Sequence, residues 1–307
     1  VSAPGSIMLL GEHAVLHGNP GIVCAVDKRL RVAAVPRTDR RVIIRSPLGD
    51  LDGYLDHTME SHTHRFVLAL LARWRSRLST GFNLTISSDF SHEVGLGSSA
   101  ALTVAVAAVL RRLSGLPLRQ RALLDECLSV VRQVQGQASG ADLAAAIHGG
   151  VLCYRPVTGG VLALGNTLPL ALYYCGYKMP TPEVIALVEA QRASLSLLYD
   201  RLFQVMGECT QQAVSAIQSG DLPQLGQCMN VYHGLLDSLG VCDNTLASMV
   251  FHLRDQGALG AKISGSGLGD CVVCLLNPGQ QAPEMPAFSD MGIGVSARGV
   301  AFESETD

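Results

Sequence analysis

Short apolar stretches, broken by Gly, Pro, Asp and Asn, run through the first half of the chain and predict β-strands. These stretches are rich in aliphatic and β-branched residues and span residues 1–10, 21–26, 29–36, 41–46 and 82–87. Before the last of them, apolar residues recur at helical spacing over residues 63–78, with arginines on the opposite side. This period predicts an amphipathic helix.

Helical patterns dominate the rest of the chain. An alanine-rich helix is expected over residues 98–113, because Gly115 and Pro117 follow it as stop signals. A short helix is expected after Ser139, running from Asp142 to a pair of glycines. Further helices are expected over residues 118–133, 180–191, 194–218, 223–239 and 244–256, and strands over residues 168–175 and 271–276.

This mixture of elements predicts an α+β chain, and 307 residues are enough for two domains that share a cleft. We expect domains of residues 1–165 and 166–307.

A hydrophobic content of 48% with a net charge of -3 excludes a disordered chain and gives no general attraction to nucleic acid or membrane surfaces. Residues 104–110, an apolar run, are too few to cross a bilayer, and the opening residues lack a secretory pattern, so a cytoplasmic protein is expected.

The strongest chemical signal is a Gly-Ser loop between a predicted strand and the alanine-rich helix. It consists of Gly95, Leu96, Gly97, Ser98, Ser99, Ala100 and Ala101. Backbone N–H groups and the positive end of the helix dipole converge there, and glycines let a phosphate approach the backbone. Ser98 and Ser99 add hydroxyl donors or a ligand for Mg²⁺. The Walker and Rossmann patterns are absent, and a simple tight turn is the alternative interpretation of the loop alone.

Two other segments support phosphate binding. The opening APGSIMLLGEHAVLHG places Glu12 and His13 where a strand meets a turn, and KISGSGLGDCVVCLL is a second Gly-Ser loop that contains Gly265 and Ser266. Together with residues 95–101, these segments resemble the three motifs of the GHMP kinases, the family of galacto-, homoserine, mevalonate and phosphomevalonate kinases. The motifs occur in the family's order over nearly the whole chain. The mevalonate kinase branch is the most similar, also through the stretch GYKMPTPEVIALV.

This resemblance implies both a fold and a reaction. The fold would be the two-domain α+β GHMP kinase fold, with an N-terminal domain like domain 2 of ribosomal protein S5 and a ferredoxin-like C-terminal domain. ATP and Mg²⁺ would bind between them, and the γ-phosphate would pass to a hydroxyl of mevalonate or a similar small polar metabolite of isoprenoid precursor synthesis. The loop from Gly95 to Ala100 would bind ATP, whereas the acceptor would contact Glu12, His13, Asp142, Gly265 and Ser266. A homodimer is expected on the same analogy.

Asp142 is the candidate catalytic residue, since SGADLAAAIHGG resembles the segment that carries the catalytic aspartate of mevalonate kinases. Phosphoryl transfer needs a held triphosphate, neutralised charge and an oriented hydroxyl whose proton has an acceptor. The small residues around Asp142 leave space for a substrate. The alternative is that Asp142 only caps the helix after Ser139. For Glu12 and His13 the alternative is a solvated turn.

One departure from the family pattern concerns the charge on the transferred phosphate. Ser6 stands where mevalonate kinases usually carry a lysine that stabilises the transition state. Serine cannot supply a cation, so another residue or Mg²⁺ has to do so. Lys178 and Lys28 are the candidate substitutes, and a plain exposed lysine is the alternative interpretation of each.

A second departure concerns the metal. Val131 stands where the family generally has a Mg²⁺-binding glutamate. Glu93 precedes the phosphate loop, and we hypothesise that Glu93 or His92 contacts the nucleotide phosphates or Mg²⁺. His62 and His64 have no acid or Cys partner at ligand spacing, so they are interpreted as solvated residues before a helix.

The nine cysteines are scattered and mostly lie in apolar runs, which favours free buried thiols. Cys271 and Cys274 have the CxxC spacing of redox and metal sites. They lie in a predicted strand, however, where side chains three residues apart point to opposite faces.

Two alternatives to a mevalonate-type kinase stay open. The first is a kinase of the same fold for phosphomevalonate or a sugar, and the second is a non-catalytic sensor that binds ATP and a metabolite. The first motif of the related decarboxylase is missing, and GEHAVLHG favours the mevalonate kinases. Ser6 and Val131, which replace the usual lysine and glutamate, are compatible with a non-catalytic sensor. Asp142 argues against a sensor, because a sensor needs no base.

Overall fold

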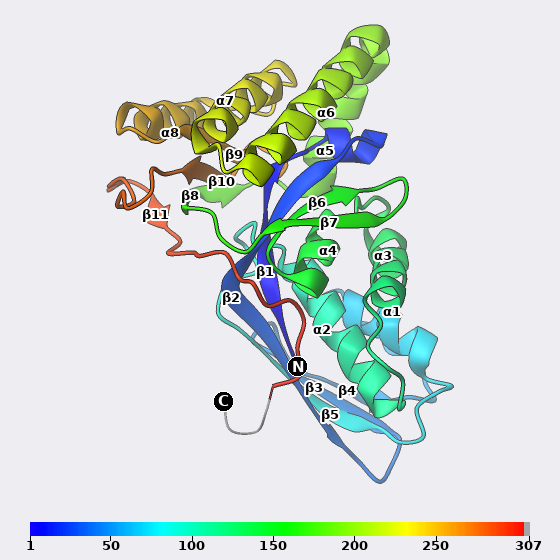
Figure 1. Ribbon diagram of the computed structural model, residues 1–307. Helices are drawn as coiled ribbons and strands as arrows, with labels where there is room; N and C mark the ends of the chain where they lie inside the picture. Colours follow the sequence, from blue (N-terminus) through cyan, green and yellow to red (C-terminus); the bar gives the residue numbers. More distant parts are fainter. Residues whose placement is uncertain (304–307) are drawn as a thin grey trace.

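The computed structural model describes residues 1–303 and contains two β-sheets with helices packed against them (Figure 1). The first sheet has seven strands and comes from the first half of the chain, and the second has four. Within the described residues, no helix is both long and apolar enough to cross a membrane. The expected α+β architecture is confirmed.

The first sheet is organised around β2. Its strands are β1 (Ser2–Leu10), β2 (Gly21–Pro36), β3 (Arg41–Arg45), β4 (Leu51–Tyr54), β5 (Phe82–Ser88), β6 (Val151–Arg155) and β7 (Gly160–Gly165). They run in the order β4-β3-β5-β2-β6-β7, and β1 pairs with β2 beside this path. β2 pairs with β6 near its start and with β5 near its end, and β1 runs antiparallel to it.

Four helices pack on this sheet, and α2 is central among them. They are α1 (Arg65–Trp74), α2 (Ser98–Leu113), α3 (Gln120–Gln135) and α4 (Ala141–His148). α2 contacts β1, β2 and the other three helices. Its alanines are almost fully buried, and such small side chains allow a helix to approach its neighbours closely. This packing holds the N-terminal end of α2 beside β1.

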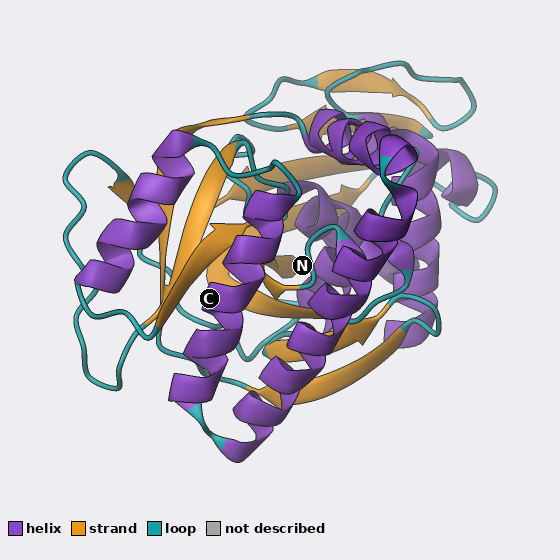
Figure 2. Ribbon diagram, turned by 90° about the horizontal axis from the view of Figure 1, so that it is seen from above, coloured by secondary structure: helices purple, strands orange, loops and turns teal. Residues whose placement is uncertain are grey.

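The second half of the chain forms a smaller antiparallel sheet under long helices. Its strands are β8 (Leu170–Lys178), β9 (Gly260–Ser264), β10 (Gly269–Leu275) and β11 (Ser289–Asp290), in the order β11-β8-β10-β9. Its helices are α5 (Thr181–Ser194), α6 (Ser196–Ser219), α7 (Leu222–Ser238) and α8 (Asn244–Asp255). α7 and α8 pack on β9 and β10, which are buried along their whole length. Figure 2 shows several of the long helices in front of the strands.

The two halves meet along the end of β1 and the short 3-10 helix η1 (Ala14–His17). The Ser264 hydroxyl donates to the Met8 carbonyl at 3.0 Å, which joins β9 to β1. The end of the chain then returns to the first sheet, where Ser296 N donates to Ala25 O and Ala301 N donates to Ser2 O, both at 2.9 Å. The domain boundary after residue 165 stays a prediction, and residues 294–301 pack on the first sheet.

The structure corrects one interpretation of the sequence and confirms another. His64 is not solvated: it is 5% exposed, and its ring nitrogens lie 3.1 Å from Ser61 Oγ and 3.3 Å from Ser46 Oγ. His62 is exposed, as expected. All nine cysteines are free thiols, including the CxxC pair buried in β10, which confirms their structural interpretation.

Candidate active site

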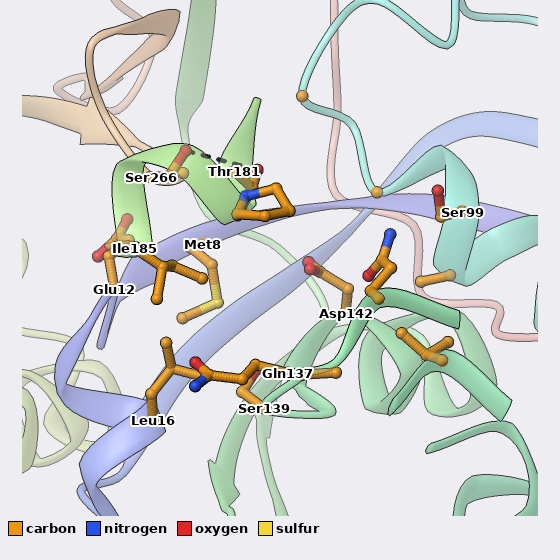
Figure 3. Close-up of a pocket in the computed structure, with 18 of the residues that line it drawn as sticks. Met8, Glu12, Leu16, Ser99, Gln137, Ser139, Asp142, Thr181, Ile185 and Ser266 are labelled. Atoms are coloured by element: carbon orange, nitrogen blue, oxygen red, sulfur yellow. Dashed lines mark hydrogen bonds between the residues drawn. The ribbon is translucent and has the colours of Figure 1, made fainter. Parts of the chain in front are cut away.

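A cavity of about 580 Å³ lies where the two halves of the chain meet. Its wall combines the phosphate-loop segment, the turn after β1, the start of α4, the first turns of α5 and the loop before β10. In the view of Figure 3, Asp142 lies between Ser99 on one side and Glu12 on the other. All of the candidate acceptor-binding residues line this one cavity.

The Gly-Ser loop comes very close to neighbouring side chains. α2 begins at Ser98, and Gly97 precedes it with a left-handed φ of 64° that favours glycine. A Cβ atom at Gly97 would overlap the Ser6 hydroxyl, and one at Gly95 would overlap the Asp270 carboxylate. The loop therefore needs both glycines. Its free N–H groups and the start of α2 make an anion site.

Leu96 differs from the rest of this loop. It is fully buried, whereas Gly95, Gly97, Ser98, Ser99 and Ala100 line the cavity. Its carbonyl accepts a hydrogen bond from Ser6 N at 3.0 Å. Leu96 thus anchors the loop to β1, and its assignment to ATP binding stays a prediction.

Asp142 lies in the first turn of α4 and faces the cavity. Its Oδ1 accepts a hydrogen bond from the Ser6 hydroxyl at 2.8 Å. Gly140 is the N-cap residue of the helix, and Ser139 Oγ accepts from Ala141 N at 3.2 Å, so the capping role that was the alternative for Asp142 does not apply. Although Asp142 is partly accessible through the cavity, the protein around its carboxyl group raises its pKa, and the Ser6 hydroxyl opposes this shift. A carboxylate with a raised pKa is suited to accept a proton.

Glu12 is a buried carboxylate at the other end of the cavity. Its Oε1 lies 2.5 Å from Lys262 Nζ, and the Tyr232 hydroxyl donates to its backbone carbonyl at 2.9 Å. Burial raises the pKa of Glu12, and the lysine opposes the shift. The second oxygen, Oε2, is buried without a hydrogen-bond partner among residues 1–303. Glu12 is therefore no solvated turn residue, and it keeps one oxygen free for a donor.

His13 and Ser266 form another contact between the two halves. His13 Nε2 lies 2.9 Å from the Ser266 carbonyl, and burial lowers the histidine pKa. Because a carbonyl only accepts, we assign the ring proton to Nε2, which leaves Nδ1 of neutral His13 as an acceptor. The Ser266 hydroxyl donates to Thr181 Oγ1 at 3.5 Å (Figure 3). Thr181, at the start of α5, was not singled out in the sequence, where it appeared only within GYKMPTPEVIALV.

Asp270 is the site residue that the sequence analysis missed most clearly. It is 2% exposed, its Oδ1 accepts from Gly95 N at 2.7 Å, and its Oδ2 lies 2.8 Å from Lys178 Nζ. Its φ of 76° is unusual for a residue other than glycine. The sequence did offer one signal for this residue, because Asp270 directly follows a Gly-rich run in SGSGLGDC.

Of the two candidate lysines, Lys178 lines the cavity, whereas Lys28 lies near Asp89 elsewhere on the first sheet.

The candidate metal-binding side chains do not form one cluster. Ser99 and His92 line the cavity, and so does Val131, whose apolar side chain cannot bind a cation. Glu93 is exposed to solvent, outside the cavity lining, so its role as a ligand stays a prediction from the sequence. Residues 1–303 contain no group of three or more His, Cys, Asp or Glu side chains that could hold a metal ion by themselves.

Comparison with known proteins agrees with this geometry. The chain matches the models of the GHMP kinases N terminal domain over residues 62–150 and of the GHMP kinases C terminal over residues 213–287. A mevalonate kinase of Pyrococcus furiosus is 30% identical over 89% of this chain and 88% of its own length, and one of Aeropyrum pernix is 32% identical over 91% and 89%. The crystal structure of L. major mevalonate kinase in complex with R-mevalonate is similar with a TM-score of 0.76 and 25% identity, covering 97% of this chain and 96% of that one.

Proposed function

The chain belongs to the GHMP kinase family, and on this premise we propose that it transfers the γ-phosphate of ATP to a hydroxyl group of mevalonate. It is a phosphotransferase with an alcohol acceptor. The observation that carries the choice of reaction is that Asp142 faces a single cavity between the phosphate loop and the Glu12–His13 turn.

The nucleotide binds through its phosphates at the start of α2. The N–H groups of residues 97–100 lie at the positive end of the helix dipole, where a phosphate is stabilised without a Walker lysine, while Gly95 N is held by Asp270. The triphosphate then directs its terminal phosphate toward Asp142, whose side chain lies next to this loop through Ser6.

Asp142 acts as the proton acceptor. The acceptor hydroxyl gives its proton to the Asp142 carboxylate, the hydroxyl oxygen forms a bond to the γ-phosphorus, and the bond from that phosphorus to the ADP oxygen breaks. The Ser6 hydroxyl holds one carboxylate oxygen of Asp142 at 2.8 Å, which leaves the other free for the substrate. Positioning of this kind supplies much of the rate in phosphoryl transfer.

The acceptor end of the cavity suits a small molecule with both hydroxyl groups and apolar carbons. Met8, Leu16 and Ile185 form an apolar wall at the same end of the cavity as the polar groups of Glu12 and Ser266 (Figure 3). A sugar exposes hydroxyl groups on all sides and would leave some of them against this wall without partners. Mevalonate carries a methyl and methylene groups that match it.

Mg²⁺ is expected to enter with the nucleotide. A magnesium ion usually keeps most of its waters and binds substrate phosphates plus one or two protein ligands, so this site needs no cage of protein carboxylates. The Ser99 hydroxyl, at the start of α2 on the cavity wall, would be the protein ligand of such an ion. Mg²⁺ supplies charge neutralisation on the phosphates when it is bound.

The decisive experiment incubates the protein with ATP, Mg²⁺ and, separately, mevalonate, phosphomevalonate and galactose. We expect phosphorylation of mevalonate, and a loss of about 10²–10⁴-fold in kcat in Asp142→Asn, which keeps the size and the acceptor atom of the side chain but not its basicity. Phosphorylation of another acceptor alone would change the assigned substrate. Binding of ATP without any transfer would favour a sensor, and near-normal turnover by Asp142→Asn would refute the assigned base.

Two further expectations from the family resemblance belong to this proposal. We propose a homodimer and a cytoplasmic location, neither of which the catalytic argument needs. Sedimentation of the purified protein would measure its oligomeric state.

A further inference from the structure

The cavity contains far more negative than positive charge. Among residues 1–303, four carboxylates line it, and Lys178 is the one lysine or arginine that does so. The whole chain has only three lysines. A phosphoryl group in transfer carries negative charge on its oxygens that has to be stabilised. Besides a bound metal ion, Lys178 is the permanent cation available for that task.

The other two lysines are committed elsewhere. Lys262 is fully buried, and its ammonium group is held by Glu12 and by its neighbouring carbonyl at Ile263. Lys28 lies on β2 near Asp89, outside the cavity lining. Neither of them lines the cavity.

Lys178 is tied to the phosphate loop through Asp270. Lys178 ends β8, its side chain is 26% exposed, and its Nζ lies 2.8 Å from Asp270 Oδ2. The other oxygen of Asp270 accepts from Gly95 N at 2.7 Å. One buried carboxylate therefore fixes the position of the ammonium group relative to the loop that holds the nucleotide.

Lys178 is also close enough to Asp142 to act on its charge. Its positive charge opposes the rise in the pKa of Asp142 that burial causes, whereas Asp270 adds to that rise. Ser6 connects Asp142 to the same loop, because Ser6 N donates to Leu96 O and Ser6 Oγ donates to Asp142. The base and the cation are thus both anchored to one loop, and both line the cavity beside it.

We infer that Lys178 is a catalytic residue that contacts the transferring phosphoryl group, and that Asp270 is the positioning residue that holds it there. The inference rests on the proposed function. Lys178 exchanges no proton in this step: the acceptor proton goes to Asp142, the new P–O bond forms as the bond to ADP breaks, and ADP leaves with the electron pair. The ammonium group stabilises the oxygens of the group in transfer.

The main test compares Lys178→Met with Lys178→Arg, using Lys28→Met as the matched control. We expect kcat to fall by about 100-fold or more in Lys178→Met, as for the loss of one transition-state donor. The equilibrium Kd for ATP should change much less, because the loop N–H groups stay in place. Lys178→Arg should recover part of the rate, and Lys28→Met should behave as wild type.

Asp270→Asn tests the positioning role, since asparagine keeps an acceptor for Gly95 N but removes the anionic partner of Lys178. We expect an intermediate loss in kcat with a nearly unchanged KM for ATP. The acid limb of the kcat/KM profile should move to higher pH in Lys178→Met and to lower pH in Asp270→Asn, because Lys178, Asp270 and Ser6 are the groups that act on Asp142. A purely structural role would not shift this limb in opposite directions.

The outcomes separate this inference from the proposed function. An active wild type with a folded Lys178→Met variant of near-normal kcat would overturn the role of Lys178 and leave the kinase assignment intact. A Lys178→Met variant that binds ATP more weakly but keeps its kcat would overturn this role too, because Lys178 would then stabilise only the bound ground state. A wild type that phosphorylates no acceptor would contradict the proposed function itself, and the role of Lys178 with it.

Discussion

At the scale of single residues, the site depends on Ser6, a small hydroxyl in a crowded place. It is 1% exposed, its N–H donates to Leu96 O and its hydroxyl donates to Asp142. The hydroxyl also lies where a Cβ of Gly97 would be, so the backbone of the phosphate loop passes directly over it. Ser6 therefore sets the distance between the base and the nucleotide, although it carries no charge.

The role of Ser6 leads to a prediction about pH. Asp142 must be deprotonated to accept a proton, so activity falls as pH drops through its pKa. Burial raises this pKa and the Ser6 hydroxyl lowers it, so Ser6→Ala should move the acid limb of the kcat/KM profile to higher pH. The measurement is a pH profile of both proteins at saturating Mg²⁺. An acid limb in Ser6→Ala that lies at or below that of wild type would contradict the assignment of Asp142 as the titrating base.

The local parts of this site could be predicted from the sequence, and the long-range parts could not. The Gly-Ser loop and Asp142 each stand in a short motif whose glycines, serines and helix start have a direct physical meaning. The contact from Lys178 to Asp270 joins residues far apart in the chain. It exists only because β8 and β10 pair in one register.

At the scale of elements too, local features could be predicted from the sequence and long-range pairing could not. α2 was predicted with its observed bounds, because its alanine-rich pattern has a clear start and stop. β2 was predicted as two strands, since polar residues at 27–29 interrupt its apolar pattern. It continues as one strand because it changes partners there, from β6 to β5. Residues 262–264 were expected to belong to the second Gly-Ser loop, and their pairing with β10 makes them part of the buried strand β9.

The buried pair of Glu12 and Lys262 joins β9 to the turn after β1, so it links the two halves of the chain. Both side chains are almost completely buried. Removing one partner of such a pair leaves an unpaired buried charge, so we expect Lys262→Met to lower the free energy of unfolding by about 3–5 kcal/mol. Denaturant unfolding followed by circular dichroism measures this change.

The double variant Glu12→Gln with Lys262→Met is the matched comparison. It removes both charges, so it should be more stable than Lys262→Met alone. Arg45→Met, which breaks an exposed pair with Asp50, should leave the unfolding midpoint unchanged. A Lys262→Met protein as stable as wild type would show that Glu12 is neutral in the fold and that the pair does not join the two halves.

At the scale of the whole molecule, residues 294–301 pack along the first sheet beside β1 and β2. Asp27 N donates to Gly294 O, Ser296 N donates to Ala25 O and Ala301 N donates to Ser2 O. The Arg29 guanidinium adds bonds to the carbonyls of Arg298 and Gly299. Because β1 also carries Ser6, this segment supports the strand on which the base depends.

The contact between Ser2 and Ala301 allows a test of this support by a single substitution. Ala301→Pro removes the N–H that donates to Ser2 O at 2.9 Å, whereas Ala301→Gly keeps it. We expect the proline variant to lose about 1–3 kcal/mol in the free energy of unfolding, because the Ser2 carbonyl loses its backbone donor and keeps only Arg29 Nη2 at 3.3 Å, and the glycine variant to lose less than 1 kcal/mol. Chemical unfolding of both variants measures the difference. Equal stabilities would mean that residues 294–301 only lie against the first sheet, and that β1 is held in place by β2, α2 and α4 without them.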